Sequence, residues 1–217
     1  MPNWDDNSPQ LRENLARVSA SIQQDAERRP VPTLLNARTW HRLMMADLTM
    51  PDDVPAAGVF RGEPSLDDYE VQIGNALGVW ASSVSSELQE FETTLQEVVA
   101  TLDQRYPQGT KLDEDGLAAV IDVAAWAHSE WVRIHPFPNG NGRTARAWVN
   151  WIFTRYGVPP IVPLRPRPGD GYANACARAM NGDWQPTVEV FTAMLHEATA
   201  ASPESRSSTK RHKKAAP

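Results

Sequence analysis

A twelve-residue stretch, His135 to Arg146, constrains the fold of this chain more than any other part of the sequence. It reads HPFPNGNGRTAR and lies between two segments with helical character. Apolar residues recur at three- and four-residue spacing in residues 114–134, and residues 144–156 predict a second helix. Two prolines in the stretch bias the residues before them away from helical conformation, so the first helix should end near His135. The pattern predicts a helix, a tight loop and a second helix.

A loop that closes onto a helix N-terminus is suited to binding an anion. The first backbone N–H groups of a helix lack partners within it, and the helix dipole adds positive partial charge there. Gly140 and Gly142 carry no side chain, so the backbone can approach a ligand closely, and Asn141 can hydrogen-bond across the turn. Arg143 and Arg146 lie on one helix face and can bind the same phosphate. Together these residues predict a polyphosphate site.

His135 lies at the mouth of this predicted site. A neutral imidazole there could take a proton from an attacking hydroxyl group. The alternative is a helix-end histidine that only contacts the last carbonyl groups, and the Gly-Asn-Gly-Arg run downstream favours the catalytic interpretation. Phe137 is expected to bury its ring and lock the loop. The two arginines could instead be solvated helix charges, but their place at the loop–helix junction favours phosphate contact.

The stretch resembles the signature of the Fic/Doc (Fido) proteins, H-x-F-x-[DE]-G-N-G-R-x-x-R. The positions that match in identity and spacing are His135, Phe137, Gly140, Asn141, Gly142, Arg143 and Arg146. The similarity is strongest over residues 123–157 and extends more loosely, by element order, over residues 38–196. Within the family, the sequence resembles the AMP-transferring branch.

The resemblance implies an all-α fold, a mainly helical bundle with a short β-hairpin flap before the motif. It also implies an enzyme, a toxin-like protein adenylyltransferase that moves AMP from ATP to a Ser, Thr or Tyr hydroxyl of a target protein. In that scheme His135 is the base and residues 140–142 form the anion hole. Arg143 and Arg146 hold the outer phosphates, and pyrophosphate leaves.

Asn139 departs from the family signature, which has an acidic residue at this position. In matching family members that residue holds Mg²⁺, which bridges the nucleotide phosphates. Magnesium prefers charged oxygen ligands, and Asn139 offers a neutral one, so a weak metal site is expected. Three outcomes stay open: an enzyme with weaker metal affinity, an altered nucleotide or reaction such as phosphotransfer, and a module that only binds.

The flap is expected within residues 58–74. Residues 59–61 and 69–73 have short strand character, and glycine, proline and serine between them suit a turn. The expected flap residues are Val59, Phe60, Arg61, Tyr69, Val71 and Ile73. In the family the flap positions the backbone of the target beside the site. An ordinary surface hairpin is the alternative.

The rest of the chain predicts an N-terminal helix within residues 1–30, a Fic-like domain over 31–201 and a disordered basic tail over 202–217. The tail lacks any apolar residue larger than alanine or proline. Further helices are expected over 33–48, over 75–101 as one or two, over 172–180 and over 187–200.

Composition limits the remaining functions. The 217 residues carry a formal net charge of −6, which makes nucleic acid an unlikely partner. There is no apolar run long enough to span a membrane and no signal-peptide pattern. Cys176 is the single cysteine, which fits a reducing cytosol, so a cytoplasmic protein, or one delivered to another cell, is expected. His41, His128 and His196 form no recognisable metal site.

Many Fic proteins are inhibited by a helix that carries [ST]-x-x-x-E-[GN]. Here only Glu13 is followed by a suitable residue, and Pro9 stands where serine or threonine is required. The chain is therefore expected to lack an intact inhibitory motif. A small antitoxin-like inhibitor acting in trans, or no inhibition, is expected instead.

Overall fold

Helices dominate the computed structural model, which describes residues 3–50, 57–169 and 171–201. The helices and strands, in chain order, are α1 (Pro9–Arg28), α2 (Leu34–Met45), β1 (Gln72–Ile73), β2 (Ala76–Leu77), α3 (Ala81–Arg105), α4 (Glu114–Ile134), α5 (Asn141–Arg155), α6 (Tyr172–Ala179) and α7 (Gln185–Ala201). The expected all-α class with a small hairpin is confirmed. The tail predicted to be disordered lies outside the described residues, and the predicted domain boundaries stay a prediction.

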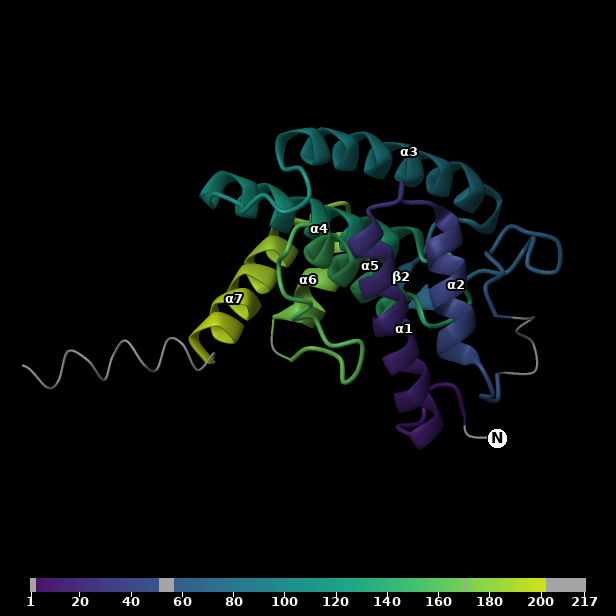
Figure 1. The fold of residues 1–217 in the computed structure, drawn as a ribbon. Helices are drawn as coiled ribbons and strands as arrows, with labels where there is room; N and C mark the ends of the chain where they lie inside the picture. Colours follow the sequence, from purple (N-terminus) through teal and green to yellow (C-terminus); the bar gives the residue numbers. More distant parts are fainter. Residues whose placement is uncertain (1–2, 51–56, 170, 202–217) are drawn as a thin grey trace, which may run out of the picture.

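Helices α4 and α5 form the centre of the bundle and frame the motif loop (Figure 1). Helix α4 begins after Asp113, whose carboxylate accepts a hydrogen bond of 2.7 Å from the backbone N–H of Gly116. It ends at His135, which has a left-handed backbone with φ of 53°. Helices α1 and α2 pack on α5, whereas α3, α6 and α7 pack on α4. No helix in the described ranges has the length and apolar character needed to cross a membrane.

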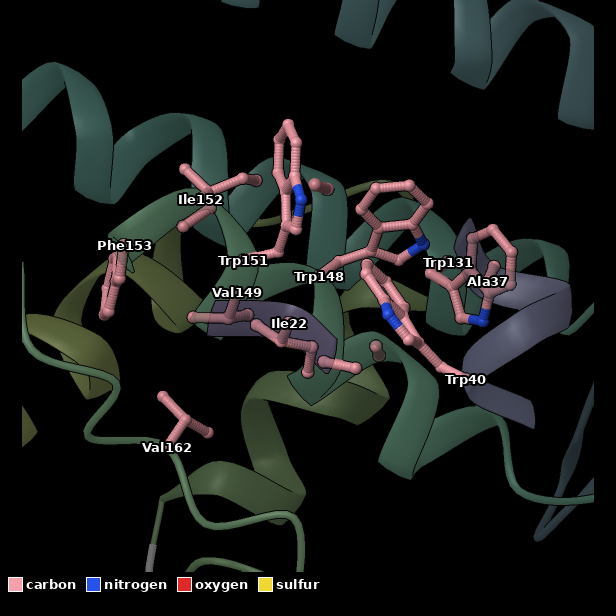
Figure 2. Close-up of a cluster of buried hydrophobic side chains, with 14 of the residues drawn as sticks. Ile22, Ala37, Trp40, Trp131, Trp148, Val149, Trp151, Ile152, Phe153 and Val162 are labelled. Carbon is pink, nitrogen blue, oxygen red and sulfur yellow. The ribbon is translucent and has the colours of Figure 1, made fainter. Parts of the chain in front are cut away.

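A group of tryptophans fills the core beneath the loop. Trp40, Trp131, Trp148 and Trp151 are fully buried, and Figure 2 shows their rings gathered from three helices. The rings of Trp40 and Trp148 meet edge to face with their centres 4.8 Å apart, a favourable aromatic geometry. Because this core holds α2, α4 and α5 together, it fixes the two helix ends that carry the motif.

The first strand of the expected hairpin is wrong, and of the second, expected over residues 69–73, only residues 72–73 form a strand. Residues 59–61 form no strand, and the hairpin consists of β1 and β2, in which Gln72 pairs with Leu77 across a turn. Phe60 packs on Phe137 with ring centres 4.7 Å apart, and the neighbouring Arg61 side chain is also buried. Adjacent side chains in a strand point to opposite faces. Phe60 and Arg61 are adjacent and both contact the interior, so these long-range contacts override the local strand preference.

Helix boundaries follow the sequence closely where local signals are strong. Helix α4 has the predicted bounds, and α5 begins at residue 141, three residues before the predicted start. Helix α3 begins at residue 81, because residues 76–77 belong to β2. Helix α1 contributes Leu11, Val18 and Ile22 to the shared core, so it packs as part of the bundle.

Candidate active site

The side chain of Asn141 closes the motif loop. Its Oδ1 accepts a 2.9 Å hydrogen bond from the backbone N–H of Phe137, and its Nδ2 donates a 2.7 Å hydrogen bond to the carbonyl of the same residue. Phe137 itself is fully buried. The amide thus binds one backbone unit through two hydrogen bonds and holds the turn shut. Its backbone N–H stays at the start of α5, where it is available to a ligand.

Gly140 is the cap of α5 and has no room for a side chain. Its φ is 70°, and a Cβ atom would lie 2.7 Å from Cε of Met45 and 3.2 Å from Nε2 of His41. Glycine alone fits both the backbone and the space. The N–H groups of Asn141 and Gly142 donate to no other described residue, as expected at a helix N-terminus.

His41, which belongs to no motif recognised in the sequence, contacts the buried side of this loop. Its Nδ1 accepts a 2.9 Å hydrogen bond from the N–H of Gly58, so Nε2 carries the proton and donates to the carbonyl of Asn139 at 3.2 Å. The ring stacks on Phe137 with centres 4.0 Å apart. Burial lowers the pKa of His41 to about 4, which keeps it neutral. No nearby sequence motif reveals this contact.

His135 is held in one tautomer by the end of α4. Its Nδ1 lies 3.1 Å from the carbonyl of Val132, which can only accept, so Nδ1 carries the proton and Nε2 is left as an acceptor. Burial lowers the pKa of His135 to about 4, and the positive charge of Arg61 contributes in the same direction. The imidazole is therefore neutral at pH 7 and able to accept a proton.

Arg61, expected on a flap strand, instead lies buried behind the backbone of His135. Its five N–H donors all have acceptors, namely the carbonyls of Tyr69, Val79, Ile134 and His135 and the carboxylate of Glu70. Two of these carbonyls belong to the end of α4, and the other acceptors flank the hairpin. One guanidinium thereby fixes the candidate base relative to β1 and β2.

Arg143 extends from the first turn of α5 into the N-terminal segment. Its Nη1 donates a 3.2 Å hydrogen bond to the carbonyl of Trp4, and its guanidinium lies 5.0 Å from the centre of the Trp4 ring. Its Nη2 is 3.8 Å from the carboxylate of Asp5 and has no hydrogen-bond partner among the described residues. Burial lowers the pKa of Arg143 to about 10, so it remains a cation at pH 7.

Arg146 is oriented by groups outside the motif. Its Nη1 donates to the Tyr172 hydroxyl at 3.1 Å and its Nη2 to the carbonyl of Leu164 at 2.7 Å. The Tyr172 hydroxyl lies 2.6 Å from Nε2 of His128. Burial lowers the pKa of His128 to about 3, so the ring is neutral and its Nε2 can accept a hydrogen bond from the Tyr172 hydroxyl. Nε of Arg146 has no partner among the described residues.

Asn139 is also buried, with 8% of its surface exposed. Neither its Oδ1 nor its Nδ2 has a hydrogen-bond partner within the described part of the chain. A buried amide left without partners costs about 1–3 kcal/mol, so a polar ligand at this place would recover free energy. Among the described residues there is no group of three His, Cys, Asp or Glu side chains able to hold a metal ion.

The site opens into a cleft with two lobes. The first lobe, of about 460 Å³, lies over the motif loop, and the second, of about 670 Å³, lies beside α6. Both are lined by Ile73, His135, Gly142, Arg146 and Arg167. Another pocket, of about 470 Å³ between α1 and residues 160–165, includes none of the motif residues.

Residues outside the motif complete the first lobe. They are Trp4, Asp5, Val71, Gln72, Ile73, Leu164, Arg165 and Arg167. Of the six expected flap residues, Val71 and Ile73 line this lobe, whereas Phe60 and Arg61 support it from the interior. Val59 and Tyr69 line neither lobe. The two arginines follow α5 in a proline-rich segment, and their Arg-Pro-Arg-Pro pattern is the one sequence signal that could have pointed to them.

Comparison with known proteins places the cleft in a family context. A sequence model of the Fic/DOC family matches residues 33–153. Protein adenylyltransferase Fic of Drosophila persimilis is 36% identical over 102 residues, which are 46% of this chain and 20% of that protein. The chain therefore spans about a fifth of the length of the curated relatives it matches.

Two solved structures share the fold. A Fic domain containing signaling protein from Bacteroides thetaiotaomicron has a TM-score of 0.59 at 21% identity, over 86% of this chain and 68% of that one. The Bartonella tribocorum protein BepC, solved with bound AMPPNP, has a TM-score of 0.52 at 18% identity, over 85% of each chain. At these identities the likeness concerns the fold.

Proposed function

The chain belongs to the Fic/DOC family, and from this premise we propose that it is a protein adenylyltransferase that transfers AMP from ATP to a protein hydroxyl group. The curated relatives that carry the name protein adenylyltransferase Fic support this activity. The observation that carries the proposal is the tautomer of His135. A neutral imidazole, with Nδ1 bound to the α4 backbone and Nε2 left as an acceptor, lies at the junction of the two lobes.

The transfer needs one base and one leaving group. The oxygen of the target hydroxyl attacks the α-phosphorus of ATP, and its proton passes to Nε2 of His135. A new oxygen–phosphorus bond forms, and the bond from the α-phosphorus to the oxygen bridging to the β-phosphorus breaks. Pyrophosphate leaves with that bridging oxygen. Because the pKa of His135 is lowered to about 4, the base is available throughout the neutral pH range.

The phosphates would lie in the first lobe. The backbone N–H groups of Gly140, Asn141 and Gly142 form the anion hole in this scheme. Arg143 and Arg146 each keep one guanidinium nitrogen without a hydrogen-bond partner among the described residues, and these two arginines would bind the outer phosphates. Their charge stabilises the pyrophosphate as it leaves.

The nucleoside and the target would occupy the remaining surfaces. The second lobe is lined in part by Tyr172, Cys176 and Met180, which suits a flat nucleoside better than a phosphate. The first lobe is lined by Ile73 of strand β1 and by Val71, the residue just before the strand. An extended segment of a target protein can add to such a strand through backbone hydrogen bonds, which places its hydroxyl side chain next to His135.

Magnesium is a poor match to the donor atoms of this site. Asn139 supplies one neutral oxygen at the position where the family signature is acidic, and Asp5, the other candidate donor, is engaged by Arg165 at 2.7 Å. When bound, Mg²⁺ would neutralise phosphate charge. We propose Asn139 as a weak ligand for a cation that arrives with the nucleotide, and no step above depends on it.

Self-inhibition through Glu13 finds no support in its surroundings. Its carboxylate pairs with Arg17 on the exposed face of α1. Arg146, the arginine that an inhibitory glutamate would bind, contacts Tyr172 and Leu164 instead. We propose that Glu13 does not inhibit the chain. An antitoxin-like inhibitor in trans and a toxin-like role stay predictions.

Radiolabelled ATP and a cell lysate test the activity. Compared with the lysate alone, the wild-type chain should add label from the α-phosphate to a target protein and should add none from the γ-phosphate. His135→Ala should abolish the transfer, and His196→Ala, an exposed residue of α7, should leave it unchanged. Equal labelling by the wild type and His135→Ala would show that the base is wrongly assigned. Transfer of the γ-label instead would identify phosphotransfer, and mass spectrometry of the target would reveal the adduct and the acceptor residue.

A further inference from the structure

The segment between α5 and α6 adds two arginines to the first lobe. Arg165 and Arg167 line this lobe, and Arg167 also lines the second. Neither belongs to the signature that the motif matches. The Arg165 side chain is 30% exposed, and the guanidinium of Arg167 lies 5.7 Å from the centre of the Tyr172 ring. Both arginines are therefore placed at the same opening as the motif arginines.

The charge of the first lobe is strongly positive. Four arginines line it, Arg143, Arg146, Arg165 and Arg167, and Asp5 is the one carboxylate among its described lining residues. Four positive charges and one negative charge leave a net charge of +3. Because position 139 is neutral, no fixed carboxylate at the loop attracts a metal ion. Such a lobe repels a free divalent cation and attracts a polyphosphate.

An anion of the chain itself already lies in this lobe. The carboxylate oxygen Oδ1 of Asp5 is 2.7 Å from Nη1 of Arg165 and 3.8 Å from Nη2 of Arg143. Two guanidinium groups from distant segments thus converge on one negatively charged oxygen. The Asp5 side chain is 58% exposed, and exposed ion pairs contribute little, so a phosphate with more charge can displace it.

We propose that Arg165 and Arg167 are phosphate-binding residues. Their positive charge takes the place of a metal ion, which the neutral Asn139 binds only weakly. The chain then needs no divalent cation to bind a nucleoside triphosphate, and a cation at Asn139 adds little to the affinity. Arg165, together with Arg143, takes the terminal phosphate where Asp5 now lies. Arg167, shared by the two lobes, takes a phosphate nearer the nucleoside. The inference rests on the proposed function for the identity of the ligand, and it concerns binding alone.

Isothermal titration of the full chain with ATP, in EDTA and in Mg²⁺, tests the proposal. The wild-type Kd for ATP should change less than threefold between the two conditions. Arg165→Ala and Arg167→Ala should each weaken ATP binding about tenfold in EDTA, which corresponds to about 1.4 kcal/mol. Arg165→Ala should leave AMP binding unchanged, since AMP lacks the terminal phosphate.

Arg178→Ala is the matched control. This exposed arginine of α6 pairs with Asp183 and lines neither lobe, so its removal should leave ATP binding unchanged. Circular dichroism of each variant excludes a loss of folding as the cause. The proposal is overturned if EDTA weakens ATP binding by the wild type more than tenfold, or if both lobe variants bind ATP as the wild type does.

The titration also separates this proposal from the proposed function. Metal-free ATP binding that depends on Arg165 and Arg167, without transfer of AMP to any protein, would support the arginines and refute the adenylyltransferase. Transfer of AMP by a chain that binds ATP only with Mg²⁺ would support the adenylyltransferase and refute the proposed role of the two arginines.

Discussion

Replacing Arg61 with methionine removes a buried charge but keeps a straight side chain of similar reach. The Arg61 side chain has no exposed surface, and all five of its donors are used. Removing one partner from a buried, hydrogen-bonded ionic group costs about 3–5 kcal/mol, and each buried carbonyl left without a donor costs about 1–3 kcal/mol. Some of the freed carbonyls can reach water in the cleft, so these costs do not add fully.

We therefore expect Arg61→Met to lower the free energy of unfolding by about 3–5 kcal/mol. That is a large share of the roughly 5–15 kcal/mol that stabilises a typical domain. For a chain of this length, a loss of 1 kcal/mol lowers Tm by about 2–4 °C, which predicts a Tm lower by about 6–20 °C. Urea denaturation and a thermal melt of the same samples measure both quantities.

Two further variants serve as controls, one that keeps the charge and one that replaces an exposed arginine. Arg61→Lys keeps the charge but has three donors in place of five, so its loss of stability should be intermediate. Arg178→Met removes an exposed ion pair with Asp183 and should cost less than about 1 kcal/mol. A loss below about 1 kcal/mol for Arg61→Met would refute the reasoning, because it would mean that the five hydrogen bonds do not hold the end of α4 to the flap.

Four other perturbations test the site. Asn139→Asp restores a carboxylate at the loop, so ATP binding should become dependent on Mg²⁺. Two opposite unit charges about 4 Å apart gain about 4 kcal/mol, of which desolvation of the carboxylate offsets a part. A calorimetric titration in which Mg²⁺ does not change ATP binding by this variant would contradict the expectation. Asn141→Ala opens the motif loop and should cost about 2 kcal/mol of stability in urea denaturation, against no loss if the loop closes by other contacts. Asp5→Asn should tighten ATP binding about twofold to threefold by calorimetry, because an exposed competing ion pair is removed. His41, His128 and His135 have pKa values of about 3 to 4, below the unfolded value of 6.5, so the unfolded state binds protons first as the pH falls. Stability should fall by up to roughly 4 kcal/mol per pH unit below pH 6.5, and equal urea midpoints at pH 7 and pH 5 would rule this out.

The parts of the fold that follow from local signals are predictable from the sequence. Helix α4 has its predicted bounds because an aspartate cap, a periodic apolar face and the prolines after residue 135 all act within a few residues. The start of α5 lies three residues early, since the Gly-Asn-Gly run that suggests a turn also forms the first helical turn. The predicted bounds of α4 and α5 therefore differ from the observed bounds by no more than one turn of helix.

The residues that support the site are not predictable in this way, because their partners are far away in the sequence. His41 binds the carbonyl of Asn139 from 98 residues away, and Arg61 binds that of His135 from 74 residues away. Periodicity and motif spacing report only near neighbours. The strand assigned to residues 59–61 is wrong for the same reason, since distant contacts decide where Phe60 and Arg61 point.

The contact between Trp4 and Arg143 has an optical consequence. Indole emission changes when a nearby cation or carboxylate moves, and the Trp4 ring lies 5.0 Å from a guanidinium that the proposed nucleotide would engage. The other seven tryptophans, four of them buried in the core, line neither lobe and form the background. Subtracting the spectrum of a Trp4→Phe variant would therefore leave a fluorescence signal that follows occupancy of the cleft in real time, without any attached dye.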